Sequence, residues 1–252
     1  MTAMKHPLLF KYKKDEKRLL SLLNTCDPAM PPLQAARAFL HAFLQPDHYA
    51  MQYRYEHCLR ACGWAKEIAE GEHWESEPLM LAALLHDVGY PFCKTVEEWP
   101  SHAAVSALIA EMFLQAIHYS PALSASICRS IAIHDIWSDI PPDATPFELS
   151  VRDADDLDRF DALRLCMISH GHIHEKGAAE IIRLCAQRLQ ELEMWQMRPC
   201  GTKTASRLWL STLEMHRETY LRLQQQMQRT TDIEKTLTPQ KEGTIHAAPE
   251  TL

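Results

Sequence analysis

The stretch LMLAALLHD, residues Leu79–Asp87, decides the fold. Seven apolar residues in a row predict a helix that is buried on every side. His86 and Asp87 stand at the end of this run, so burial of the run carries a histidine and a carboxylate into a poorly hydrated interior. Unpaired burial of such groups costs on the order of several kcal/mol. A divalent transition metal would offset that cost, because His and Asp are both good ligands for such ions.

Composition narrows the class of protein. The 252 residues are 46% hydrophobic and 23% charged, which is globular composition and enough chain for one large domain or two small ones. The formal net charge of −7 makes binding to nucleic acid unfavourable. The basic cluster within residues 11–18 predicts a solvated helix face or a contact for an acidic partner.

The chain also carries signals of its cellular location. The eight cysteines lack paired spacing, the first residues do not form a signal peptide, and no apolar run approaches the roughly 20 residues that span a bilayer. We therefore expect a cytoplasmic protein with reduced thiols and no membrane segment.

Helix-forming residues dominate, and strand-like alternation is nearly absent. The sequence predicts an all-α helical bundle whose core contains the metal site at His86 and Asp87. Its expected parts are an N-terminal helical extension (1–49), the core (50–175), C-terminal helices that pack on the core (176–228) and a disordered tail (229–252). The expected helices are Asp15–Leu23, Pro32–Leu44, Ala50–Glu70, Glu77–Asp87, His102–Ile117, Leu123–His134, Pro146–Ser169, Ala178–Met197 and Ala205–Gln228.

Further histidines and an aspartate lie on other predicted helices or at their ends. They are His57, His102, His134 and Asp153. Taken singly, a helical histidine is usually hydrogen-bonded or exposed, and an aspartate is usually at the surface or a cap. Side chains from different helices can nevertheless converge on one metal site inside a bundle.

Read in order, these residues resemble the HD superfamily of metal-dependent phosphohydrolases. The resemblance runs from about Arg54 to Phe160. It implies a helical bundle with its metal site in the core. The matching motifs are Arg54-x-x-His57, Leu84-Leu85-His86-Asp87-Val88-Gly89, Ser101-His102-Ala103-Ala104, Ile131-Ala132-Ile133-His134 and Asp153-Ala154-Asp155-Asp156-Leu157-Asp158.

The resemblance implies the roles of these residues. By the match, one metal is held by His57, His86, Asp87 and Asp153. Members with two further histidines bind a second metal, which implies a binuclear site with Asp87 as the bridging ligand and His102 and His134 on the second ion. Helix-end capping for His102 and a favourable helix C-terminal position for His134 are the alternatives. Nitrogen and carboxylate donors suit Mn, Fe, Co, Ni or Zn.

The sequence departs from the family pattern at two positions where many relatives carry basic residues that contact phosphate. Many relatives have a lysine where this chain has Tyr90, and a basic residue where it has Asp156. The nearest cationic substitutes are Arg54, then Lys94 and Arg159.

The resemblance implies a metal-dependent phosphohydrolase that cleaves a phosphoester of a small nucleotide or phosphorylated metabolite through a metal-activated hydroxide. Asp158 either orients a histidine ligand or caps and pairs at the surface. The alternatives are a di-iron oxygenase of the same superfamily and a noncatalytic, metal-stabilised sensing or scaffold domain. The helices outside the core cover it, form a lid over the substrate, or make a homodimer contact; the sequence leaves these three alternatives open. The close spacing of His170, His172 and His174 predicts a solvated loop.

Overall fold

The computed structural model describes residues 6–46, 50–170 and 175–238. Within these ranges every regular element is helical and no strand occurs, so the predicted all-α class is confirmed. The helices are α1 (Pro7–Lys11), α2 (Lys13–Leu23), α3 (Pro32–Leu44), the π-helix η1 (Ala50–Tyr55), α4 (Glu56–Gly71), α5 (Ser76–Leu85), the short 3₁₀ turns η2 (Tyr90–Phe92) and η3 (Trp99–Ser101), α6 (His102–Ala116), α7 (Pro121–Ile133), α8 (Pro146–Phe160), α9 (Ala162–His170), α10 (Ala178–Gln196) and α11 (Lys203–Leu237).

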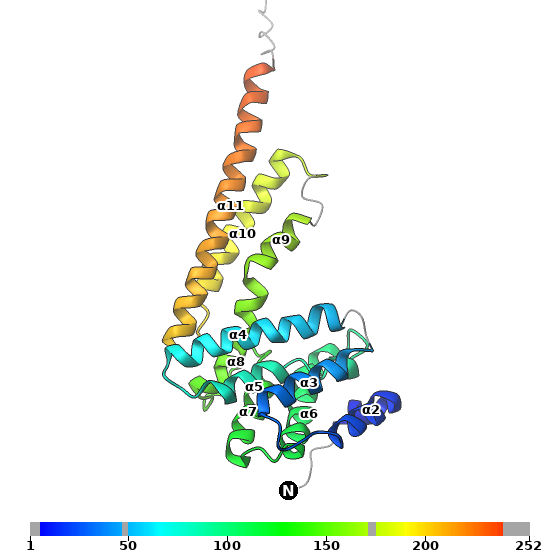
Figure 1. Ribbon diagram of the computed structural model, residues 1–252. Coiled ribbons are helices and arrows are strands. Elements are labelled where there is room, and N and C mark those ends of the chain that lie inside the picture. Colours follow the sequence, from blue (N-terminus) through cyan, green and yellow to red (C-terminus); the bar gives the residue numbers. More distant parts are fainter. Residues whose placement is uncertain (1–5, 47–49, 171–174, 239–252) are drawn as a thin grey trace, which may run out of the picture. The chain divides into compact units, whose positions relative to one another are not determined.

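The apolar run forms α5, and α5 lies at the centre of the bundle (Figure 1). It packs against α3, α4, α6, α7 and α8. Leu79, Leu81 and Leu85 are completely buried. A helix enclosed by neighbours has no solvated side, which is why its sequence shows no polar stripe.

Helix α8 begins with a reciprocal cap. The Glu148 amide donates to the Thr145 hydroxyl at 3.2 Å, and the Glu148 carboxylate accepts from the Thr145 amide at 2.8 Å. The sequence predicted one helix over Pro146–Ser169, but the structure breaks it after Phe160. At Asp161 the backbone is extended, and its carboxylate accepts from the Ala162 amide at 2.6 Å. Local side-chain bonds of this kind compete with helix continuation.

The C-terminal helix is longer than the sequence suggested. Helix α11 continues to Leu237, whereas disorder was expected from Arg229. Polar pairs four residues apart support the polar stretch, such as Arg222 with Glu218 at 2.5 Å and Gln228 with Asp232 at 2.8 Å. The remainder of the expected tail, 239–252, lies outside the described residues, as do His172, His174 and the side chain of His170.

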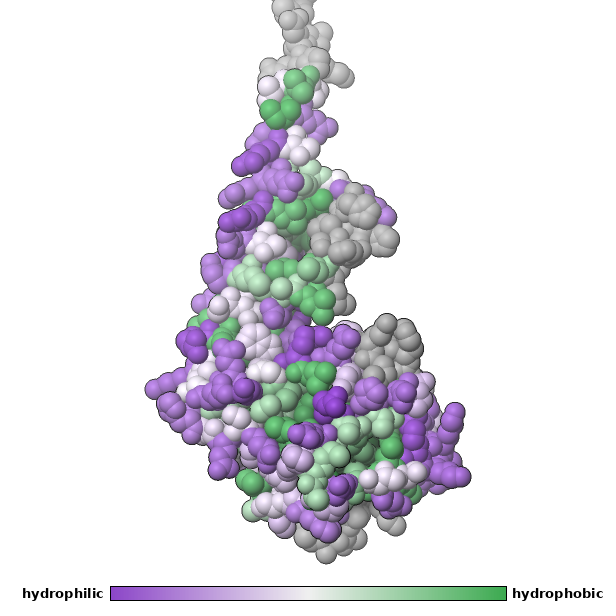
Figure 2. All heavy atoms as spheres, viewed as in Figure 1, coloured by the Kyte–Doolittle hydropathy of each residue, from purple (hydrophilic) through white to green (hydrophobic). Residues whose placement is uncertain are grey.

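The chain divides into two compact units, of which the first contains Met1–Leu165 with Arg198–Thr212 and the second contains Cys166–Met197 with Leu213–Leu252. The N-terminal helices therefore belong to the same unit as α4–α8. On the face shown in Figure 2, hydrophilic side chains cover much of the surface. Across the part of the chain that the structure describes, no helix combines the length and apolarity needed to cross a membrane.

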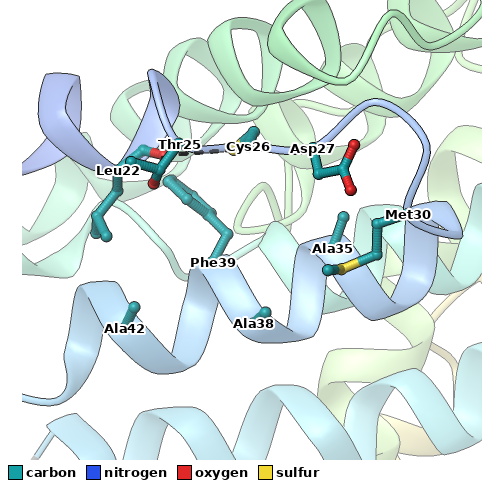
Figure 3. Close-up of a pocket in the computed structure, with 9 residues that line it drawn as sticks. All are labelled: Leu22, Thr25, Cys26, Asp27, Met30, Ala35, Ala38, Phe39 and Ala42. Carbon is teal, nitrogen blue, oxygen red and sulfur yellow. Dashed lines mark hydrogen bonds between the residues drawn. The ribbon is translucent and has the colours of Figure 1, made fainter.

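A small apolar hollow lies between the end of α2, the segment that follows it, and α3 (Figure 3). Its volume is about 230 Å³, and Phe39, Met30 and Ala38 are among its walls. Cys26 closes one side and donates its thiol to the Leu22 carbonyl at 3.5 Å. This hollow shares no lining residue with the metal-centre cavity described below.

Candidate metal centre

Four buried histidines lie at or near helix ends of the first unit. His57 is in the first turn of α4, His102 begins α6, and His86 and His134 directly follow α5 and α7. All four side chains are at most 5% exposed. These positions place all four rings inside the bundle.

Three of these rings are fixed by the main chain. In each, Nδ1–H donates to the carbonyl three residues earlier, which leaves Nε2 as the free acceptor. The bonds join His86 to Ala83, His102 to Trp99 and His134 to Ile131, each at 2.7 Å.

The fourth ring is fixed by a side chain. His57 Nδ1–H donates to Asp158 Oδ2 at 2.6 Å, and Arg60 Nε–H donates to the other oxygen of Asp158 at 2.6 Å. Burial lowers the pKa of His57, but hydrogen bonds to Asp155 and Asp158 outweigh it and raise the pKa to about 9. Of the two roles considered for Asp158, the contacts fit the one in which it orients a histidine.

The free nitrogens of His57 and His86 meet beside Asp155. The two Nε2 atoms are 3.1 Å apart, and Asp155 Oδ1 lies 3.0 Å from the first and 3.7 Å from the second. Donors bound to one metal at about 2.0–2.1 Å are separated by roughly 3.0–3.4 Å. The 3.0 and 3.1 Å separations fall in this range, and the 3.7 Å separation is slightly longer. Two acceptor nitrogens this close repel each other unless a cation or proton lies between them. These atoms therefore fit a divalent metal.

A second set of donors lies beside the first. His102 Nε2 and His134 Nε2 are 3.2 Å apart, and Asp87 Oδ1 lies 3.6 and 3.7 Å from them. Asp87 Oδ1 is also 3.6 Å from His86 Nε2, and its Oδ2 is 3.8 Å from His57 Nε2. Asp87 thus stands between the two sets, where a bridging ligand would stand.

Charge at Asp87 is maintained in spite of burial. Burial would raise the pKa of Asp87, but the charges of His86 and Arg54 hold it well below the usual range. Burial lowers the pKa of His102. Burial also acts to lower the pKa of His86, but the negative charge of Asp87 outweighs it and raises that pKa well above its usual range.

The structure places Asp155, and not the predicted ligand Asp153, beside the histidine nitrogens. Asp153 points to the other side of α8, where it accepts from the Gly201 amide at 2.6 Å and pairs with Arg198 at 3.0 Å. A helix turns about 100° per residue, so residues three apart lie on one face and residues five apart are separated by about 140°. Asp155 and Asp158 therefore share the face toward His57. The three-residue spacing between Asp155 and Asp158 in the sequence already indicates that the two side chains lie on the same helix face.

Asp156 also faces away from the metal donors. It is buried and pairs with Arg198 at 2.5 Å. The acidic residue at this position therefore belongs to a structural ion pair and leaves the cavity to other side chains.

A glycine permits the turn that follows the His86-Asp87 pair. The Gly89 amide donates to Ser106 Oγ at 2.8 Å. A Cβ at Gly89 would lie 2.7 Å from the Ser106 amide nitrogen and 2.8 Å from the His102 carbonyl oxygen. Only glycine allows the end of α5 to approach the start of α6 this closely.

A cavity of about 370 Å³ adjoins the donors. All of them except His86 line it, namely His57, Asp87, His102, His134 and Asp155. Arg54 lines it, donates Nη1–H to Asp87 Oδ2 at 2.7 Å, and stacks on the Tyr90 ring with 3.5 Å between its guanidinium carbon and the ring centroid. Arg159 also lines it and reaches Asp155 Oδ2 at 3.4 Å, with 44% of its side chain exposed. Lys94, the third cation suggested by the sequence, does not line this cavity.

Comparison with known proteins agrees with this geometry. Residues 54–163 match the family model of the HD domain. The curated proteins and the solved structures contain no match to the chain. The HD domain and the histidine–aspartate cluster together point to divalent metal binding. The resemblance expected from the ordered motifs is thereby confirmed, and residues 54–163 of this chain are an HD domain, the helical fold of a superfamily of metal-dependent hydrolases.

Proposed function

We propose that this protein is a metal-dependent phosphohydrolase that cleaves a phosphoester of a small nucleotide or phosphorylated metabolite. The observation that carries the proposal is the convergence of four imidazole nitrogens and two carboxylates beneath a cavity that two arginines line. Buried donors beneath an open cavity leave room for a substrate, which a purely structural metal site does not need.

The proposed ligands form two sets that share Asp87. On the contacts described above, His57, His86 and Asp155 would hold one ion, and His102 and His134 would hold the other. Mixed nitrogen and oxygen donors favour Mn, Fe, Co, Ni or Zn over Mg and Ca, which prefer oxygen alone. When bound, such ions lower the pKa of a coordinated water and neutralise phosphate oxygens.

The remaining residues bind and orient. Arg54 is held in place by Asp87 and the Tyr90 ring, and its other N–H groups are available to the nonbridging oxygens of a phosphate. Arg159 adds a second positive charge at the cavity wall. Asp158 acts through His57, whose ring it keeps in the tautomer that offers Nε2.

Metal content and hydrolysis test the proposal together. Protein purified without added metal should contain two equivalents of transition metal, and His134→Ala should reduce this to one. With Mn added, we expect hydrolysis of p-nitrophenyl phosphate or bis-p-nitrophenyl phosphate that His86→Ala and Asp87→Ala abolish. His73→Asn is the matched control, because His73 is exposed and asparagine tolerates its φ of 59°. Hydrolysis that survives His86→Ala would contradict the proposal.

A further inference from the structure

A larger cavity adjoins the metal-centre cavity. Its volume is about 760 Å³, and it lies between α2 and the segment that follows Tyr90. Tyr53, Arg54, Tyr90 and Trp99 line both cavities, so the two hollows share one wall. The two cavities are therefore neighbours, and a ligand that occupies both would pass these four side chains.

Cations outnumber carboxylates among the lining residues of the second cavity. Lys14, Arg18 and Lys94 line it, with Asp15 as the one carboxylate among its lining residues. Asp15 pairs with Lys94 at 2.6 Å and only loosely with Arg18, at 3.5 Å. Among the described residues, three cations against one carboxylate leave an excess of two positive charges. Arg54 adds none, because Asp87 matches its charge.

Two of these cations have a donor group or a charge without a partner among the described residues. The Nε of Arg18 is buried without a partner there, and no ion pair with Lys14 is found there either. The nearby acid Glu98 does not line the cavity, and Lys11 and Tyr12 hold its carboxylate. The cavity is therefore suited to a ligand that brings negative charge.

The Tyr90 ring does not offer a stacking surface for a base. The Arg54 guanidinium covers it at 3.5 Å from the ring centroid, and the His102 ring stacks on it with centroids 4.5 Å apart. Tyr90 is therefore occupied by these two contacts, whereas the cations named above remain on the cavity wall.

We propose that the second cavity is a subsite for a second phosphate group of the substrate, whose scissile phosphate lies at the metal centre. The preferred substrate is then a molecule with two phosphates separated by a spacer, bound between the metal cluster and the cations of α2. This inference rests on the proposed phosphohydrolase function, and it extends that function by one further anion-binding site.

Nonhydrolysable probes test the subsite apart from catalysis. Calorimetry on the metal-loaded full chain would compare alkane-α,ω-bisphosphonates of two to six carbons with butylphosphonate. We expect at least one bisphosphonate to bind at least about 10-fold more tightly than the monophosphonate. Lys14→Gln and Arg18→Gln should each weaken that bisphosphonate about 5- to 10-fold and leave butylphosphonate unchanged. Lys17→Gln is the matched control, since Lys17 is an exposed lysine of α2 that does not line the cavity.

Two different results would overturn the two proposals. Equal affinity for bisphosphonates and monophosphonate, or equal effects of Lys14→Gln and Lys17→Gln, would refute the subsite while p-nitrophenyl phosphate is still hydrolysed. Absence of p-nitrophenyl phosphate and diester hydrolysis by the metal-loaded wild type would refute the phosphohydrolase instead. Thermal melting of each variant separates loss of binding from loss of folding.

Discussion

Replacing Asp155 with asparagine removes one negative charge from the first set of metal donors and nearly preserves the shape of the side chain. The oxygen affected lies 3.0 Å from His57 Nε2 and 3.7 Å from His86 Nε2. Loss of a residue that merely orients a ligand typically costs 10- to 100-fold in metal affinity. Loss of the ligand itself should cost at least about 100-fold, or about 2.7 kcal/mol. We expect Asp155→Asn to be purified with about one equivalent of metal less than the wild type.

Asp153→Asn is the matched variant, two residues away on the same helix and equally buried. Its carboxylate contacts Arg198 and the Gly201 amide instead of the histidines. Breaking a buried ion pair destabilises a protein by about 3 kcal/mol or more. We use this lower limit because Arg198 keeps its second partner, Asp156. The melting temperature of Asp153→Asn should therefore be roughly 6–12 °C below that of the wild type, with the metal content unchanged.

Elemental analysis of the two variants, purified in parallel, measures the metal, and thermal unfolding measures stability. The assignment predicts that each variant is defective mainly in one of the two assays. If Asp153→Asn loses a metal equivalent while Asp155→Asn keeps the full amount, Asp153 is the ligand and the reasoning from the faces of α8 is wrong.

Three further substitutions probe the surroundings of the cluster. Asp158→Asn should weaken metal binding 10- to 100-fold, measured by competition with a chelator, because the His57 tautomer is no longer fixed. Gly89→Ala should destabilise the fold by about 1–3 kcal/mol and lower the occupancy of the second metal, since its Cβ would lie 2.8 Å from the His102 carbonyl oxygen. Glu98→Gln should be less stable than the wild type at neutral pH. Hydrogen bonds lower the pKa of Glu98 in the folded state from 4.5 to about 2, so this difference should shrink as the pH falls from about 5 toward 2 in parallel urea titrations.

Much of the fold follows from local sequence. The run Leu79–Leu85 has no polar side, which requires enclosure by other helices, and α5 is enclosed in that way. Proline marks helix starts such as Pro32 and Pro146, which the structure retains. The break at Asp161 was missed, because an aspartate can equally well continue a helix and only the extended backbone there shows which option is taken.

The site was predictable as an ordered series of residues and less so as a geometry. The histidines and the His86-Asp87 pair were found from their order, and the structure brings them together. The choice between Asp153 and Asp155 depends on which face of α8 meets α4. That is decided by tertiary partners such as Arg198, which is distant in sequence. The same limit applied to the basic residues of α2, whose position beside the metal-centre cavity arises from packing alone.

The way the four rings are held also separates fixed ligands from an adjustable one. His86, His102 and His134 take their tautomers from backbone carbonyls, which no point substitution removes. His57 takes its tautomer from Asp158, a side chain that mutation can replace. Variation at Asp158 would therefore retune one metal position while the other three imidazoles stay as they are. Among these four imidazoles, His57 is thus the one whose orientation depends on a replaceable side chain and not on the main chain.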